Sequence, residues 1–305
     1  MEKYGVIFAG QGAQYTGMGQ DFYLHNPILK GMYETASSLL GFNLADLCFT
    51  ENELLNQTKY TQPAILMTSI AIYETFKRKF DKPISGMMGF SLGEYSALYA
   101  SGIFDFATIL NLVKKRAQYM DECSQKKSGC MVAIINNDLT KVLELVKEFD
   151  GVWVANYNSP RQIVVSGKKE AIEQFKEKAK NFGIKRMVTL TVSGAFHSPL
   201  MEEAKNRLYL DLQKNPSSKP EFPLYLNRTG KVWDDLNNLP KVLSEQVTFP
   251  VLFEPIIRQM IQDGITTFIE IGPGTVLSGL VRQIDASVKV IAINKYEDLR
   301  NLEVL

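Results

Sequence analysis

The stretch ISGMMGFSLGEYSALYASG, residues 84–102, joins a strand pattern to a helix pattern through a turn rich in glycine. Residues 84–89 indicate a short buried strand, and the residues after Glu94 indicate a helix. The turn between them has the form Gly-x-Ser-x-Gly of a nucleophile elbow, with Ser91 at its centre. Glycine suits such a turn because larger side chains would obstruct the sharp bend and the approach to the hydroxyl group. The stretch therefore predicts a strand–turn–helix unit of an α/β fold.

The hexapeptide GFSLGE (89–94), which contains this turn, supports a second interpretation. Ser91 and Glu94 have the spacing of a capping box, which would close the start of the helix. A helix start also offers unpaired amide donors and a partial positive charge where an oxyanion would form. Since an elbow serine sits at a helix start in any case, the hexapeptide alone leaves both roles open.

Composition places the chain among ordinary globular proteins. It has 305 residues, is 45% hydrophobic and 22% charged, and carries a formal net charge of +1, which fits one large domain or two smaller ones. A near-neutral charge does not favour nucleic-acid binding. No apolar run is long enough to span a bilayer, and the first residues lack the pattern of a signal peptide. The three cysteines (48, 123 and 130) are odd in number and lack metal-site spacing, so we expect a reduced, cytoplasmic protein without a metal.

Four apolar segments separated by helical patterns predict a largely parallel α/β sheet. They are YGVIFAG (4–10), ISGMMGF (84–90), TTFIEIG (266–272) and KVIAIN (289–294). Between them, residues 130–192 read as strand, helix, strand, strand, helix, strand, which is the ferredoxin-like order. We therefore expect a small ferredoxin-like domain at 128–192, inserted into a large domain made of 1–127 and 193–305. The cleft between them is a natural place for a site.

A nucleophilic serine needs a base, and the chain has only two histidines. His25 precedes Asn-Pro and is expected to be a surface or capping residue. His197, in SGAFHSPLM, lies where the inserted segment returns to the large domain, so it is the candidate base, with a packed structural role as the alternative. A lysine base is disfavoured because no Ser-x-x-Lys pattern follows Ser91.

Two glycine turns follow strands elsewhere in the chain. The first, within FAGQGAQYTGMG (8–19), fails the dinucleotide fingerprint because Tyr15 stands where the last glycine is needed. This turn could still direct a backbone amide, such as that of Gln11, at a developing negative charge. The second, EIGPG (270–274), also reads as a plain turn into a helix.

Arg116 lies on the apolar face of its expected helix, in line with Ile109, Val113 and Met120. An inward-facing guanidinium requires an anionic partner, because an unpaired buried charge is costly. That partner is either an internal carboxylate, in a structural salt bridge, or the carboxylate of a substrate, which arginine binds in a bidentate manner.

Seven motifs together resemble the acyltransferase family of malonyl-CoA:acyl carrier protein transacylases and polyketide synthase acyltransferase domains. In order they are GQGAQ (10–14), TQPA (61–64), GFSLGEYSAL (89–98), KKRAQYM (114–120), ANYNSP (155–160), GAFHSPLM (194–201) and EIGPG (270–274). The resemblance covers essentially the whole chain. It implies an α/β-hydrolase-like domain with a ferredoxin-like insertion, and a discrete malonyl-CoA:acyl carrier protein malonyltransferase acting in trans.

The resemblance also assigns roles. Ser91 would carry the acyl group as an ester, and His197 would act as general base and then general acid. The backbone amides of Gln11 and Leu92 would form the oxyanion hole, and Arg116 would bind the malonyl carboxylate. The malonyl group would move from coenzyme A to the phosphopantetheine thiol of an acyl carrier protein, with no metal or redox cofactor.

Three further positions follow from the same resemblance. Gln246, in SEQVTFP, matches the residue whose backbone carbonyl orients the histidine of a dyad, replacing the aspartate of a triad. Phe90 stands where the family usually has histidine, which removes a polar group beside the nucleophile and would reshape the acyl pocket. Phe196 resembles the bulky residue of malonyl-selective polyketide enzymes and favours a role in polyketide rather than fatty acid synthesis.

Three other functions remain open from the sequence. A hydrolase of the same family, which clears stalled carrier proteins, tends to lose the arginine that this chain keeps as Arg116. An ordinary esterase would show an acidic residue before the histidine, and none is evident. A silent carrier-protein docking module would not need Ser91 and His197.

Overall fold

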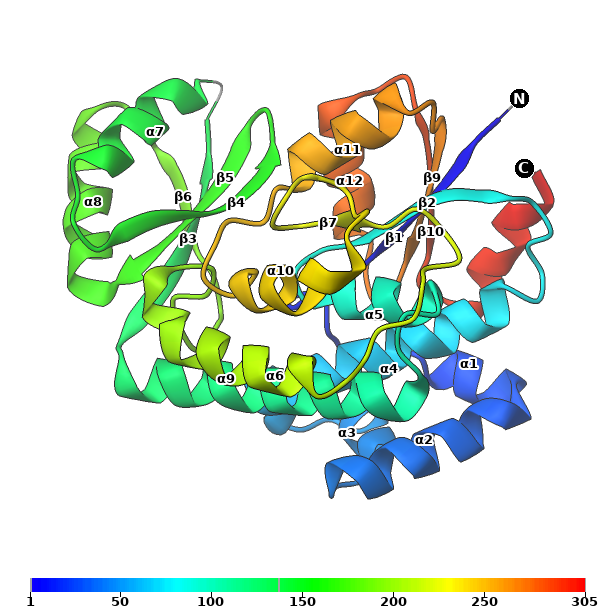
Figure 1. Ribbon diagram of the computed structural model, residues 1–305. Coiled ribbons are helices and arrows are strands. Elements are labelled where there is room, and N and C mark those ends of the chain that lie inside the picture. Colours follow the sequence, from blue (N-terminus) through cyan, green and yellow to red (C-terminus); the bar gives the residue numbers. More distant parts are fainter. Residues whose placement is uncertain (1, 137, 305) are drawn as a thin grey trace.

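The computed structural model describes residues 2–136 and 138–304 and contains two four-stranded sheets that lie next to each other (Figure 1). The first sheet is parallel, with the order β10-β9-β1-β2. Its strands are the four that the apolar segments predicted: β1 (Tyr4–Phe8), β2 (Ile84–Gly89), β9 (Thr267–Ile271) and β10 (Lys289–Ile293). The α/β class and the parallel sheet are therefore confirmed.

The register of this sheet brings the loops of interest together. Phe8, the last residue of β1, is paired with Gly89 of β2 on one side and with Ile271 of β9 on the other. The carboxyl ends of the three strands are consequently level, and ligands of open parallel sheets bind beyond such ends. The turns that contain Gln11, Ser91 and EIGPG all leave the sheet at this edge.

Helices cover the parallel sheet and build its main core. They are α1 (Gln20–His25), α2 (Pro27–Leu40), α3 (Leu44–Phe49), α4 (Thr58–Phe76), α5 (Gly93–Ala100), α6 (Phe106–Lys126), α9 (Glu202–Gln213), α10 (Leu239–Glu245), α11 (Phe253–Gln262) and α12 (Val276–Ile284). Short 3-10 turns lie at η1 (Leu54–Asn56), η2 (Pro199–Met201), η3 (Leu236–Asn238) and η4 (Tyr296–Val304), and a small hairpin pairs β7 (Tyr225–Leu226) with β8 (Lys231–Val232).

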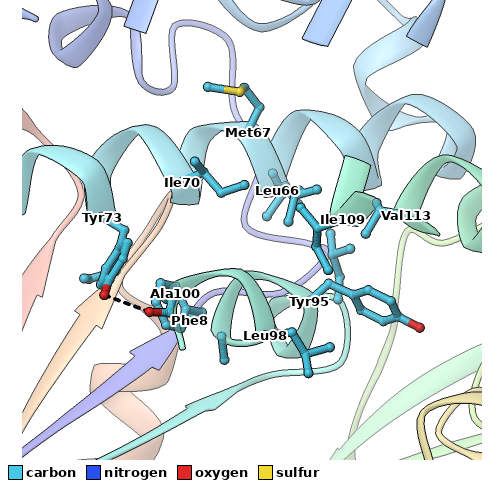
Figure 2. Packing of buried hydrophobic residues seen from close by; sticks show 14 of the residues in the cluster. Phe8, Leu66, Met67, Ile70, Tyr73, Tyr95, Leu98, Ala100, Ile109 and Val113 are labelled. Atoms are coloured by element: carbon cyan, nitrogen blue, oxygen red, sulfur yellow. Dashed lines mark hydrogen bonds between the residues drawn. The ribbon is translucent and has the colours of Figure 1, made fainter. Parts of the chain in front are cut away.

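Helix α4 is buried along almost its whole length because α5 and α6 pack against it (Figure 2). Leu66 and Ile70 of α4 lie beside Leu98 of α5 and Ile109 of α6 in this core. Each such side chain contributes about 1.5–3 kcal/mol on burial. The packing fixes α5 and α6; Ser91 lies two residues before α5, and Arg116 lies near the middle of α6.

The second sheet is antiparallel, with the order β4-β5-β3-β6. Its elements are β3 (Gly129–Ile135), α7 (Leu139–Lys147), β4 (Val152–Ser159), β5 (Gln162–Lys168), α8 (Lys169–Asn181) and β6 (Arg186–Thr189). Side chains of β3 alternate between its faces: Val132 and Ile134 pack under α7 and α8, whereas Met131 and Ala133 join the main core.

One strand of this region is shorter than expected, and another is hydrogen-bonded to a segment outside the region. The strand expected to continue to residue 192 ends at Thr189, and the three residues after it leave the sheet and line a cavity. Val251, just before α11, binds strand β4: its N–H donates to the carbonyl of Ala155 and its carbonyl accepts from the N–H of Tyr157, at 2.9 and 3.0 Å.

Within the described ranges, no helix combines the length and apolarity needed to cross a bilayer. The same residues contain no cluster of histidine, cysteine or acidic side chains suited to a metal ion.

Candidate active site

The elbow between β2 and α5 holds Ser91 in a strained backbone conformation. Ser91 has φ 52°, and His197 has φ 56°; no other non-glycine residue in the described part of the chain has a positive φ. Such a residue costs on the order of 1–3 kcal/mol and persists only where its surroundings hold it. Glycine is required at position 89 because two parts of the backbone lie very close together there. A Cβ on Gly89 would lie 1.9 Å from the backbone of Gly93.

The capping-box interpretation of Ser91 and Glu94 is wrong. Helix α5 begins at Gly93, its cap position is Leu92, and no side chain caps it. The Ser91 hydroxyl is bonded to His197 instead, and the Glu94 carboxylate accepts hydrogen bonds from Asn227 and Gln246. Hydrogen bonds to residues elsewhere in the fold therefore replace the local capping bonds of both side chains.

Ser91 and His197 have the geometry of a dyad, and the backbone of Gln246 contacts the histidine. The Ser91 Oγ lies 2.8 Å from His197 Nε2, and His197 Nδ1 lies 2.8 Å from the carbonyl oxygen of Gln246. Because a carbonyl only accepts, Nδ1 carries the proton and Nε2 is left to accept from the serine hydroxyl. The expected contact of His197 with the Gln246 backbone is thus present.

His197 is buried, and its surroundings keep it neutral. Burial, followed by the positive charge of Arg116, lowers the pKa of His197 from 6.5 to about 4. The imidazole is therefore free to accept a proton at neutral pH. His25, by contrast, is exposed, stacks on Tyr296 at 4.2 Å and plays no part in this geometry, as expected of a surface residue.

Arg116 points into the same site from the buried face of α6. Its Nη1 donates to Gln62 Oε1 at 2.7 Å, and its Nη2 donates to Gln246 Oε1 at 2.8 Å and lies 3.3 Å from Ser91 Oγ. In the part of the chain that the structure describes, no carboxylate forms a salt bridge with Arg116, so the structural ion pair considered from the sequence is not formed. The guanidinium is held by two neutral amide oxygens, and its Nε has no hydrogen-bond partner among the described residues.

A cavity of about 400 Å³ lies between the two sheets, and the dyad is in its wall. Ser91, Arg116 and His197 line it together with the predicted pocket residues Phe90 and Phe196. The other lining residues come from the loop after β1, from strands β3, β4, β5 and β9, from residues 190–192, from α12, and from Asn56 and Met120. The Phe90 ring packs edge-on against Phe253 at 5.4 Å.

The proposed oxyanion donors lie on two neighbouring turns. Leu92 directly follows the nucleophile, and Gln11 lines the cavity. Within residues 2–136 and 138–304 neither backbone N–H donates to another protein atom. The Gln11 side chain is bonded to Thr58 and Gln62, which steadies its turn.

Sequence reasoning missed three participants. Gln62 lies in the TQPA motif but received no role, and Glu94 was interpreted only as a capping residue. Asn227 belongs to none of the seven motifs, yet its Oδ1 accepts the Ser91 N–H at 2.7 Å and its Nδ2 donates to the Gly89 carbonyl at 2.7 Å. No local pattern around Asn227 signals this contact. The EIGPG turn proved structural, since Glu270 accepts from the N–H groups of Leu277 and Ser278 at the start of α12.

Comparison with known proteins gives consistent results. The acyl transferase domain family matches residues 6–295. A malonyl CoA-acyl carrier protein transacylase of Bacillus subtilis (strain 168) is 40% identical, over 98% of this chain and 96% of that protein. One of Staphylococcus aureus (strain MRSA252) is 36% identical, over 98% of both.

Solved structures agree with the sequence relatives. The crystal structure of MCAT from Streptococcus pneumoniae is 43% identical and superposes with a TM-score of 0.93, over 99% of this chain and 100% of that one. A malonyl-transacylase in complex with its type II PKS acyl-carrier protein is 34% identical, with a TM-score of 0.96 and complete coverage of both chains.

Proposed function

Since this chain belongs to the acyl transferase domain family and transfers malonyl groups from malonyl-CoA to an acyl carrier protein, we propose that Ser91 carries the group between the two thiols as an ester. The observation that supports this role is the chain of hydrogen bonds from Ser91 through His197 to the Gln246 carbonyl, each 2.8 Å long. A serine in this arrangement is an activated nucleophile.

The first half-reaction uses groups that are already in place. As Ser91 Oγ attacks the thioester carbonyl, its proton passes to His197 Nε2. The oxyanion that forms accepts hydrogen bonds from the backbone amides of Leu92 and Gln11. Its collapse expels the thiolate of coenzyme A, which takes the proton from Nε2 and leaves the malonyl ester on Ser91.

The second half-reaction is the reverse with a different thiol. The phosphopantetheine thiol gives its proton to His197 Nε2 and attacks the ester carbonyl. The same two amides stabilise the oxyanion, and the Ser91 oxygen recovers the proton as it leaves. The groups used in this scheme are those of the protein, the coenzyme A thioester and the carrier-protein thiol.

Arg116 selects the malonyl group in this proposal. Gln62 and Gln246 hold the guanidinium beside the nucleophile, and a carboxylate that binds its planar fork places the thioester carbonyl at Ser91. An acetyl group lacks this contact. The expectation from Phe196 that the carrier protein belongs to polyketide synthesis stays a prediction.

We also propose how the domains are divided. Residues 1–127 and 193–305 form the α/β-hydrolase-like domain, and residues 128–192 form an inserted ferredoxin-like subdomain. The strand order β4-β5-β3-β6 with two helices on one face supports the second assignment. In this division the cavity lies between the two domains, and His197 follows directly after the insertion.

Intact-mass measurement tests the role of Ser91. Malonyl-CoA should add one malonyl mass to the wild-type protein and none to the Ser91→Ala variant. Ser101→Ala is a matched control, because Ser101 is a buried serine whose hydroxyl bonds only to backbone carbonyls of its own helix. A stable adduct on Ser91→Ala, or its loss from Ser101→Ala, contradicts the assignment.

A further inference from the structure

Glu94 is a buried carboxylate that the transfer chemistry does not use. It lies in the first turn of α5, three residues after the nucleophile, and is completely shielded from solvent. Its Oε1 accepts the N–H of Asn227 at 2.6 Å, and its Oε2 accepts from Gln246 Nε2 at 2.7 Å. A carboxylate in such a place is retained only where hydrogen bonds and charge compensate its burial.

Both partners of Glu94 hold the reacting residues. Asn227 binds the N–H of Ser91 through its side chain, and Gln246 Nε2 binds the carbonyl oxygen of Ser91 at 2.9 Å. Gln246 also accepts from Arg116 and from His197. Glu94 therefore orients Asn227 and Gln246. These two residues in turn hold the strained elbow, His197 and Arg116.

Arg116 is the charged group that acts on Glu94. The side chain of Gln246 connects the two residues: its Oε1 accepts a hydrogen bond from Arg116, and its Nε2 donates one to Glu94. Burial raises the pKa of Glu94 to about 7, whereas the two N–H donors and Arg116 oppose this rise. Glu94 consequently passes between its neutral and charged forms near neutral pH.

The other titratable or charged groups nearby are mostly engaged with residues other than Glu94. Strands β1 and β2, which pack against α5, contain no charged side chain. The remaining groups are Glu74 of α4, bonded to Tyr99 at 2.9 Å near the far end of α5; Arg228, beside Asn227, paired with Glu245 at 3.1 Å; Tyr95, buried beside Arg116; and His197, bonded to Ser91.

We propose that Glu94 is the internal counter-ion of Arg116 and a positioning residue for the dyad, and that its charge competes with the malonyl carboxylate for the same guanidinium. The inference rests on the proposed function, because it requires malonyl to pair with Arg116. Two carboxylates near one cation repel each other through a medium of low dielectric constant. A charged Glu94 thus weakens the preference for malonyl over acetyl, and a neutral Glu94 strengthens it.

The ratio of kcat/KM for malonyl-CoA to that for acetyl-CoA, in acylation of Ser91, measures this competition. Effects on His197 and on the coenzyme A portion act on both donors and cancel in the ratio. At pH 8.5, where Glu94 is charged, Glu94→Gln should raise the ratio about fivefold, even though poorer positioning lowers both rates. In the wild type the ratio should rise towards that value as the pH falls from 8.5 to 6, since Glu94 takes up a proton.

Glu270→Gln is the matched control. Glu270 is also a buried glutamate beside the cavity, but it bonds to the start of α12 and not to the Arg116 network. This variant should keep the wild-type ratio at every pH. A ratio in Glu94→Gln no higher than in the wild type at pH 8.5, or an equal rise in Glu270→Gln, overturns the inference.

The wild-type pH series provides a second measurement if Glu94→Gln does not fold. A ratio that stays constant or falls between pH 8.5 and 6 then contradicts the competition. Failure of the proposed function looks different, because no malonyl ester forms on Ser91 at any pH.

Discussion

Asn227→Ala should disable the nucleophile without touching a reacting atom. Asn227 is fully buried, and its amide accepts from the Ser91 N–H and donates to the Gly89 carbonyl, both at 2.7 Å. These two bonds lie on either side of Phe90, the residue at which the chain turns out of β2. Alanine removes both and leaves two backbone groups without partners.

The loss can be estimated from these contacts. Each buried polar group that loses its partner costs about 1–3 kcal/mol, so the loss of two such partners should lower the free energy of unfolding by about 2–6 kcal/mol. The left-handed conformation of Ser91 itself stores on the order of 1–3 kcal/mol, which is comparable with what the bonds supply. The elbow is therefore expected to relax and move Ser91 Oγ away from His197. A misplacement near 1 Å costs about a hundredfold in rate.

Thermal unfolding and rapid-quench acylation measure the two effects. In a chain of 305 residues the Tm should fall by roughly 3–9 °C, and acylation by malonyl-CoA should slow about a hundredfold. Asn215→Ala is the control, because the Asn215 side chain donates to the Asp211 carbonyl near the end of α9, away from the site. If Asn227→Ala keeps its Tm within about 1 °C and its rate within about twofold of the wild type, the elbow is held by the local chain and the reasoning is refuted.

The geometry of the site leads to four other predictions. Because burial and Arg116 lower the pKa of His197 to about 4, kcat/KM for acetyl-CoA should persist as the pH falls through 6.5 and decline only nearer 4; a midpoint at 6.5 in the pH–rate profile contradicts this. The same lowered pKa means that protein stability is lost as the pH falls from 6.5 towards 4, since the unfolded chain takes up the proton first. Arg116→Ala should reduce malonyl transfer far more than acetyl transfer, whereas equal losses with a lower Tm would show a structural role alone. In competition between malonyl-CoA and methylmalonyl-CoA, Phe196→Ser should relax selectivity more than Phe90→His, by at most about a hundredfold; the reverse ranking would place Phe90 at the α-carbon.

The sequence by itself determined the strands of the parallel sheet and the order of the elements between them. Hydrophobic periodicity encodes both, because each apolar segment records which side chains must leave water. It also indicated the dyad, since the chain contains only two histidines and one of them precedes Asn-Pro. The burial of Arg116 could also be predicted from the sequence, because its position on an apolar stripe is a local property of one helix.

Only the tertiary structure decided the partners of these residues. Glu94 has the spacing of a capping box, but its carboxylate accepts hydrogen bonds from Asn227 and Gln246, which are distant in the sequence. Arg116 is met by the amides of Gln62 and Gln246 rather than by a carboxylate. Hydrogen bonds between residues more than a hundred positions apart depend on how whole elements pack, and a pattern confined to neighbouring residues carries no record of that packing.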